Sequence, residues 1–130
     1  RIAIVRSRRL ARPVPLKSFG DGVNRLFGIV LSLVNAKDGC LLIDEFENGL
    51  HHTVQENAWR MIFKLAAELN VQVFATTHSV DAVLAFQQVS RAVPETGALI
   101  RLARRGQSIV ATVLDEDELA VVAKNQIEVR

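Results

Sequence analysis

The chain has 130 residues, 49% of them hydrophobic and 23% charged, which is the composition of a folded globular domain and not of a disordered segment. A formal net charge of +2 and an aromatic content of 5% argue against two classes of nucleic-acid protein, those that bind DNA through overall charge and those that stack single-stranded bases. The sequence shows no signal peptide or membrane span, and its single cysteine, Cys40, is expected to be a small buried hydrophobic residue in a cytoplasmic protein.

The amino-terminal part is expected to form a strand over residues 1–6, followed by a basic turn. For the five arginines near this end, we favour solvated strand edges and turns over a strip that contacts phosphates. Pro13 and Pro15 place the next segment at a sheet edge or in an extended linker. A loop at residues 18–22 then opens a helix with apolar residues at helical spacing. Its expected buried stripe contains Val23, Leu26, Phe27, Val30, Leu31 and Val34.

The middle of the chain has the pattern of a β-α-β unit. Residues 40–44 form an apolar run that is typical of a buried strand. A helix is expected over about residues 53–69, and Thr53 and Glu56 have the spacing of a capping box. A second strand is expected over residues 71–77. The crossover between the strands is long enough for them to pair in parallel.

The last third of the chain is expected to begin with a short helix over residues 80–88, capped by Ser79. Two strand-like runs, residues 98–103 and 108–114, flank a turn and predict a hairpin, and a final helix is expected from Asp115. The predicted fold class is therefore α/β, a layered fold with a mainly parallel sheet flanked by helices, a C-terminal β-hairpin and a helix.

Polar residues follow both strands of the predicted β-α-β unit. Asp44 and Glu45 end the first strand, and Thr77 and His78 end the second. Because parallel strands present their carboxyl ends at the same sheet edge, we expect these four residues to lie close together. Asp44 is suited to bind the Mg²⁺ of a nucleotide, Glu45 to activate a water and His78 to contact a terminal phosphate. The simpler interpretation is an acidic strand end that faces solvent, and the ordered succession of these segments makes it the less favoured one.

These motifs resemble those of a known family. Residues 41–45 resemble the Walker B strand and catalytic glutamate of ABC-type ATPases. Residues 47–51 resemble the D-loop region of bacterial AAA-family ATPases related to SMC proteins and to the overcoming-lysogenization-defect nucleases. Residues 76–79 resemble the switch-histidine motif, and residues 18–22 resemble the signature loop. The resemblance covers roughly residues 14–86.

The resemblance implies a P-loop NTPase fold of the ABC-ATPase type, with ATP and Mg²⁺ as ligands. It implies that Asp44 binds Mg²⁺, that Glu45 is the general base and that His78 senses or positions the γ-phosphate. It also implies an ATP-dependent dimer in which the signature loop and the helix end behind it face the nucleotide of a second copy. The residues of that loop with this implied role are Ser18, Gly20, Asp21 and Gly22.

The phosphate-binding loop of such ATPases is missing from the sequence. No Gly-x-x-x-x-Gly-Lys-Ser/Thr segment is present to surround the phosphates with backbone amides. We therefore expect residues 1–130, which begin with Arg, to be the carboxyl-terminal portion of one ABC-type ATPase domain and to bind ATP poorly alone. The alternative is a non-catalytic dimerisation or interaction module that keeps the fold. DNA and a nuclease or other effector subunit are compatible further partners.

The segment after the acidic pair allows one more interpretation. His51 and His52, with Asp44 and Glu45, would be ligands in a zinc hydrolase, but adjacent histidines usually diverge, and this is the least favoured alternative. We assign His51 to a loop between subunits and His52 to a helix start. Phe46 stands where many relatives carry proline, which is expected to affect the stiffness of the loop more than its chemistry.

Overall fold

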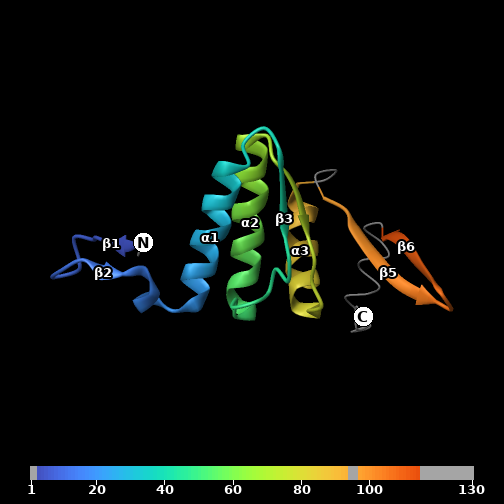
Figure 1. Cartoon of the computed structure of the whole chain (residues 1–130), viewed down its shortest axis with the longest axis horizontal. Helices are drawn as coiled ribbons and strands as arrows, with labels where there is room; N and C mark the ends of the chain where they lie inside the picture. The colour runs from blue at the N-terminus through green and yellow to red at the C-terminus, as the bar shows by residue number, and fades with distance from the viewer. Residues whose placement is uncertain (1–2, 94–96, 115–130) are drawn as a thin grey trace.

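The computed structural model describes residues 3–93 and 97–114 (Figure 1). In chain order, its elements are β1 (Ile4–Val5), β2 (Val14–Pro15), the 3₁₀-helix η1 (Leu16–Phe19), α1 (Asp21–Asn35), β3 (Cys40–Ile43), α2 (His52–Leu69), β4 (Gln72–Ala75), α3 (Val80–Ala92), β5 (Leu99–Arg105) and β6 (Ser108–Leu114). The final helix expected from Asp115 lies outside the described residues. Within the described ranges, no helix is both long and apolar enough to cross a membrane.

The predicted β-α-β unit is confirmed. β3 and β4 pair in parallel, with a register that runs from Cys40 beside Gln72 to Ile43 beside Ala75. Helix α2 connects them and ends at Asn70, whose left-handed conformation (φ 53°, ψ 51°) turns the chain back toward the sheet. The two strands therefore end at one edge. The other described strands form two antiparallel pairs, β1 with β2 and β5 with β6, and the second pair is the predicted hairpin.

The capping box predicted for α2 is wrong. The helix begins at His52, one residue earlier than expected, so Thr53 lies in its first turn and not at the cap. His51 is the capping residue, and its Nδ1 accepts a hydrogen bond from the Thr53 amide at 3.4 Å. Glu56 instead pairs with Arg60, one turn farther along the helix, at 2.6 Å. The imidazole of His51 thus accepts from the Thr53 amide, which in the predicted box would have donated to the carboxylate of Glu56.

The core is centred on Phe46, which directly follows the acidic pair. Phe46 is 0% exposed and its ring stacks on Trp59, with 3.9 Å between ring centroids. The Trp59 indole N–H donates to the carbonyl of Ala82 at 3.0 Å, which fixes α2 against α3. Phe46 therefore anchors the loop in the core, a role that its comparison with proline did not predict. The apolar residues buried with them come from α1 to α3 and the segments between: Ile29, Leu33, Ile43, Leu50, Ala58, Ile62, Val71, Ala82, Ala85 and Val89.

The predicted buried stripe of α1 is wrong in most positions. The buried residues of α1 are Ile29 and Leu33, at 5% and 0% exposure, and Leu26 of the predicted stripe packs against the core while only partly buried. By contrast, Phe27, Leu31 and two valines of the predicted stripe are exposed. The apolar residues of this helix form one wide stripe, so their spacing did not single out the part of the stripe that contacts α2.

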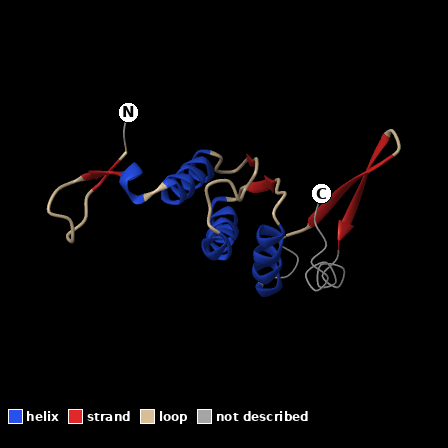
Figure 2. Cartoon of the chain, turned by 90° about the horizontal axis from the view of Figure 1, so that it is seen from below, coloured by secondary structure: helices blue, strands red, loops and turns tan. Residues whose placement is uncertain are grey.

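The parallel pair is covered on one face only. Helices α2 and α3 lie on the same side of β3 and β4 (Figure 2). On the other side, Leu42 is 77% exposed and Phe74 is 49% exposed. Cys40 is exposed too, so the prediction that it is buried is wrong. Parallel sheets are ordinarily covered on both faces, which makes this face a surface that the described residues leave without a partner.

Candidate functional site

The carboxyl ends of β3 and β4 are joined through Thr76. Its hydroxyl donates to Asp44 Oδ1 at 2.6 Å and accepts from the Glu45 amide at 2.9 Å. The backbone continues the connection, because the Phe46 amide donates to the Thr76 carbonyl at 2.9 Å. Asp44 and Glu45 are thus held beside the end of β4, with both side chains exposed. The sequence had placed Thr77 in this group, whereas the hydroxyl that contacts Asp44 belongs to Thr76.

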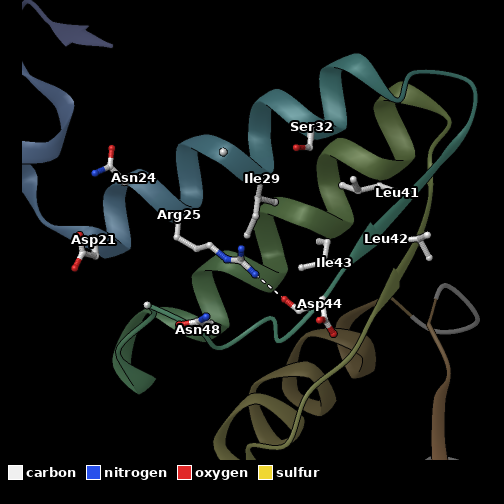
Figure 3. A pocket seen from close by; sticks show the side chains of 12 residues that line it. Asp21, Asn24, Arg25, Ile29, Ser32, Leu41, Leu42, Ile43, Asp44 and Asn48 are labelled. Carbon is white, nitrogen blue, oxygen red and sulfur yellow. Dashed lines mark hydrogen bonds between the residues drawn. The ribbon is translucent and has the colours of Figure 1, made fainter. Parts of the chain in front are cut away.

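Glu45 has a backbone conformation that only a few per cent of non-glycine residues adopt. Its φ is 46°, in the left-handed region. Two donors satisfy its carbonyl: the Asn48 amide at 2.9 Å and Arg25 Nη2 at 3.1 Å. The same Arg25 nitrogen donates to the Asp44 carbonyl at 2.7 Å, and this bond is drawn in Figure 3. Hydrogen bonds from a distant helix and from the following turn therefore stabilise the bend between Asp44 and Phe46.

Arg25 was missed in the sequence. It is the only basic residue of α1, in an otherwise largely apolar helix, and that isolation was the available signal. The spacing between α1 and β3 gave no reason to place its guanidinium beside the acidic pair, because the contact depends on how the two elements pack.

A second connection between the strand ends runs through Glu47. Its Oε2 accepts from the Thr77 hydroxyl at 2.6 Å, and its Oε1 accepts from the His78 amide at 2.9 Å. Burial alone would raise the pKa of Glu47, but these two hydrogen bonds and the nearby His78 ring together hold it below the ordinary value of 4.5. Ser79 extends the connection, since its amide donates to Thr77 Oγ1 at 3.1 Å. Glu47 thus fixes the backbone of His78, whose side chain is exposed.

The lowered pKa predicts how Glu47→Gln alters stability with pH. Ionised Glu47 stabilises the fold at pH values above its unfolded pKa of 4.5, and this contribution is lost as the pH falls through the lower folded pKa. We expect the variant to have a lower free energy of unfolding than the wild type near neutral pH, with the difference shrinking below about pH 4.5. Urea unfolding over a series of pH values measures this. The matched control is Glu68→Gln, which replaces an exposed carboxylate of α2, and an equal trend with pH in both variants would contradict the role given to Glu47.

A groove of about 580 Å³ lies between α1 and β3 (Figure 3). Asp21 and Asp44 both line it, so the amino end of α1 and the acidic pair border one space. Of the other signature-loop residues, Gly22 packs against the turn after the acidic pair, where an added Cβ would lie 3.2 Å from the Gly49 carbonyl oxygen. Ser18 lies in η1 and Gly20, with φ 92°, precedes α1; neither lines the groove. The helix starts at Asp21, so the predicted loop is shorter than residues 18–22.

The carboxylates fit a cation that is held partly by phosphate and water. The described part of the chain contains no group of three or more His, Cys, Asp or Glu residues arranged to hold a metal, so the zinc interpretation has no ligand set there. Asp44 by contrast offers an exposed carboxylate at a strand end, oriented by Thr76. One such hard oxygen ligand matches Mg²⁺ bound with a nucleotide, because Mg²⁺ takes few protein ligands and keeps several waters.

Known proteins share sequence similarity with this chain. The chain is 35% identical over 85 residues to an ATP/GTP phosphatase of Helicobacter pylori, in a match that covers 60% of this chain but 22% of the relative. It is 31% identical over 94 residues to the uncharacterized protein MJECL11 of Methanocaldococcus jannaschii, covering 72% of this chain and 82% of that protein. The chain therefore spans about a fifth of the Helicobacter relative and most of the archaeal one.

The fold matches a solved SMC ATPase. The similarity covers 88% of this chain and 66% of the other, with a TM-score of 0.61 and 12% sequence identity, in a structure from work on ATP-driven dimerization and DNA-stimulated activation of SMC ATPases. The predicted P-loop NTPase fold class is thereby confirmed. Residues 4–85 also match a family model described as "AAA domain, putative AbiEii toxin, Type IV TA system". The chain belongs to this family of AAA domains.

Proposed function

We propose that this chain provides the Walker B and switch-histidine side of an ATP-hydrolysing site. The main support for the proposal is the connection between the ends of the two parallel strands. There the Thr76 hydroxyl donates to the side chain of Asp44 and accepts from the backbone amide of Glu45. A purely structural strand end would not need two adjacent exposed carboxylates held at a fixed bend. The names of the relatives and the SMC-type fold support an ATPase of this class. We infer that the chain is the carboxyl-terminal portion of one ATPase domain, whose phosphate-binding loop lies on another segment.

Each residue has one task in this proposal. Bound Mg²⁺–ATP supplies a γ-phosphoryl group whose negative charge the cation offsets. Asp44 would hold the cation, with its carboxylate oriented by the Thr76 hydroxyl. Glu45 accepts a proton from the attacking water through its exposed carboxylate. His78 donates from its ring toward the terminal phosphate, with its backbone fixed by Glu47.

We further propose that ATP clamps two copies of the domain together and that hydrolysis releases them. Ser18, Gly20, Asp21 and Gly22 would face the nucleotide held by the second copy, because the amides at the start of α1 favour an anion. The SMC structure was studied for ATP-driven dimerization, which supports this geometry. DNA-stimulated activation is described for SMC ATPases, and for this chain a DNA or nuclease partner is a proposal that turnover measurements with added duplex DNA would address.

Replacing Asp44 with asparagine tests the proposed site. In the complete gene product we expect Mg²⁺-dependent ATP hydrolysis, and we expect Asp44→Asn to lower turnover by at least about 100-fold because the cation loses its charged ligand. A phosphate-release assay over a range of Mg²⁺ concentrations measures both. Asp81→Asn, in the first turn of α3, is the control. Undiminished turnover in Asp44→Asn would contradict the role of Asp44, and a wild-type protein that neither binds nor hydrolyses ATP would contradict the proposed function.

The second candidate is a non-catalytic dimerisation or interaction module. It is favoured by one observation, the absence of a phosphate-binding loop from these 130 residues. The coding sequence upstream of Arg1 distinguishes the two functions. A Walker A motif there supports the ATPase, and a start codon at or just before Arg1 supports the module.

A further inference from the structure

We propose that Arg25 is a positioning residue that couples the signature segment to the acidic pair of the same chain. A nucleotide held by the second copy against residues 18–22 would thereby alter the placement of Asp44 and Glu45 in the first copy's own site. This inference rests on the proposed function, and it adds communication between the two sites of the dimer.

The first part of the connection is the guanidinium itself. A single nitrogen, Arg25 Nη2, donates to the carbonyls of both Asp44 and Glu45, at 2.7 and 3.1 Å. These are the two carbonyls that flank the bend carrying the acidic side chains. A shift of α1 along its axis would lengthen both bonds at once. The backbone of Glu45, already at φ 46°, would then lose one of the two donors that satisfy its carbonyl.

The second part is the close packing of α1 against the turn that follows the acidic pair. An added Cβ at Gly22 would lie 3.2 Å from the Gly49 carbonyl oxygen, and one at Gly49 would lie 4.0 Å from Arg25 Cβ. Gly49 has φ 75°, a conformation that suits glycine. The first turn of α1 and this turn therefore approach each other too closely for a side chain at Gly22 to fit without a shift, so a movement of one is expected to affect the other. The turn that contains Gly49 is also hydrogen-bonded to the bend at Glu45, because the Asn48 amide donates to the Glu45 carbonyl at 2.9 Å.

The remaining donors of Arg25 indicate that this contact can change. Its Nε is buried and has no hydrogen-bond partner in the part of the chain that the structure describes. The guanidinium therefore lacks one of the hydrogen bonds that it could form, and a buried donor without a partner is energetically unfavourable. A movement of α1 that gave Nε a partner would compensate for weaker bonds to the acidic pair. A coupling element requires two competing arrangements, and the unpartnered Nε is the reason to expect a second one here.

Kinetics of the complete gene product test the role of Arg25. We expect Arg25→Met to lower kcat about 10- to 100-fold with little change in the KM for ATP, because misplaced catalytic groups slow the chemical step more than they weaken binding. Arg25→Lys should keep much more of the wild-type kcat than Arg25→Met does, because a single donor nitrogen makes both hydrogen bonds and lysine also offers one. Arg60→Met is the matched control, because Arg60 is exposed and pairs only with Glu56 on its own helix among the described residues. An unchanged kcat in Arg25→Met would overturn the inference.

A double-mutant cycle separates coupling from a local structural role. Ser18→Ala alters the signature segment, and we expect its effect on kcat to be much smaller in the Arg25→Met background than in the wild type. Additive effects would overturn the inference while leaving the ATPase proposal intact. If Arg25→Met does not fold, the same cycle decides with Arg25→Gln, whose side chain is shorter and uncharged. A wild-type protein without ATP hydrolysis would overturn both proposals.

Discussion

Replacing Glu45 with glutamine in the complete protein is expected to abolish ATP hydrolysis and to leave ATP-bound dimers that persist. Glutamine keeps the size of the side chain but cannot accept the proton of the attacking water, and loss of a general base typically costs about 100- to 10,000-fold in rate. In the described part of the chain, the Glu45 carboxylate forms no hydrogen bond or ion pair, while its backbone forms several. The substitution therefore removes the proton acceptor while disturbing few contacts.

Two measurements check this prediction. Steady-state phosphate release gives turnover, and light scattering after size-exclusion chromatography with ATP gives the oligomeric state. Glu68→Gln is the matched control, because Glu68 is exposed on α2 and lies 3.9 Å from Lys64. Turnover in Glu45→Gln that equals the wild type would reject Glu45 as the base. A variant that no longer binds ATP would assign Glu45 to nucleotide binding and not to proton transfer.

Truncating Phe46 to alanine is expected to lower the free energy of unfolding by about 3–5 kcal/mol. The ring is 0% exposed and stacks on Trp59 at 3.9 Å, so its removal leaves a cavity beneath the acidic pair. Trp59 is the single tryptophan of the chain, and its fluorescence during urea unfolding reports on this site. The matched control is Phe27→Ala. Phe27 is 40% exposed on α1, and we expect its truncation to cost about 1 kcal/mol or less. Equal losses in the two variants would contradict the core role of Phe46.

The β-α-β unit could be predicted because its signals are local. The apolar run before Asp44, the periodic helix and the second strand before Thr77 fix the strand direction, and parallel pairing then brings the strand ends together. The hairpin and the Ser79 cap were predictable for the same reason, and Ser79 Oγ does accept from the Ala82 amide at 3.3 Å. The fold class and the place of the acidic pair follow from these elements.

Other features depend on packing that one sequence does not encode locally. Arg25 contacts carbonyls 19 and 20 residues away, and its identity gives no hint of them. The buried face of α1 was missed because the apolar stripe of the helix is wide and only its contact with α2 selects Ile29 and Leu33. Cys40 was expected to be buried because an apolar strand suggests two covered faces, whereas the described residues cover one.

The left-handed backbone of Glu45 has a thermodynamic consequence of its own. A non-glycine residue in this region costs of order 1–3 kcal/mol, and glycine would avoid most of that cost. A domain that needed only to fold and to associate would therefore be more stable with glycine at this position. Keeping a glutamate there trades stability for the placement of a carboxylate, which is the compromise expected of a position whose side chain takes part in a reaction.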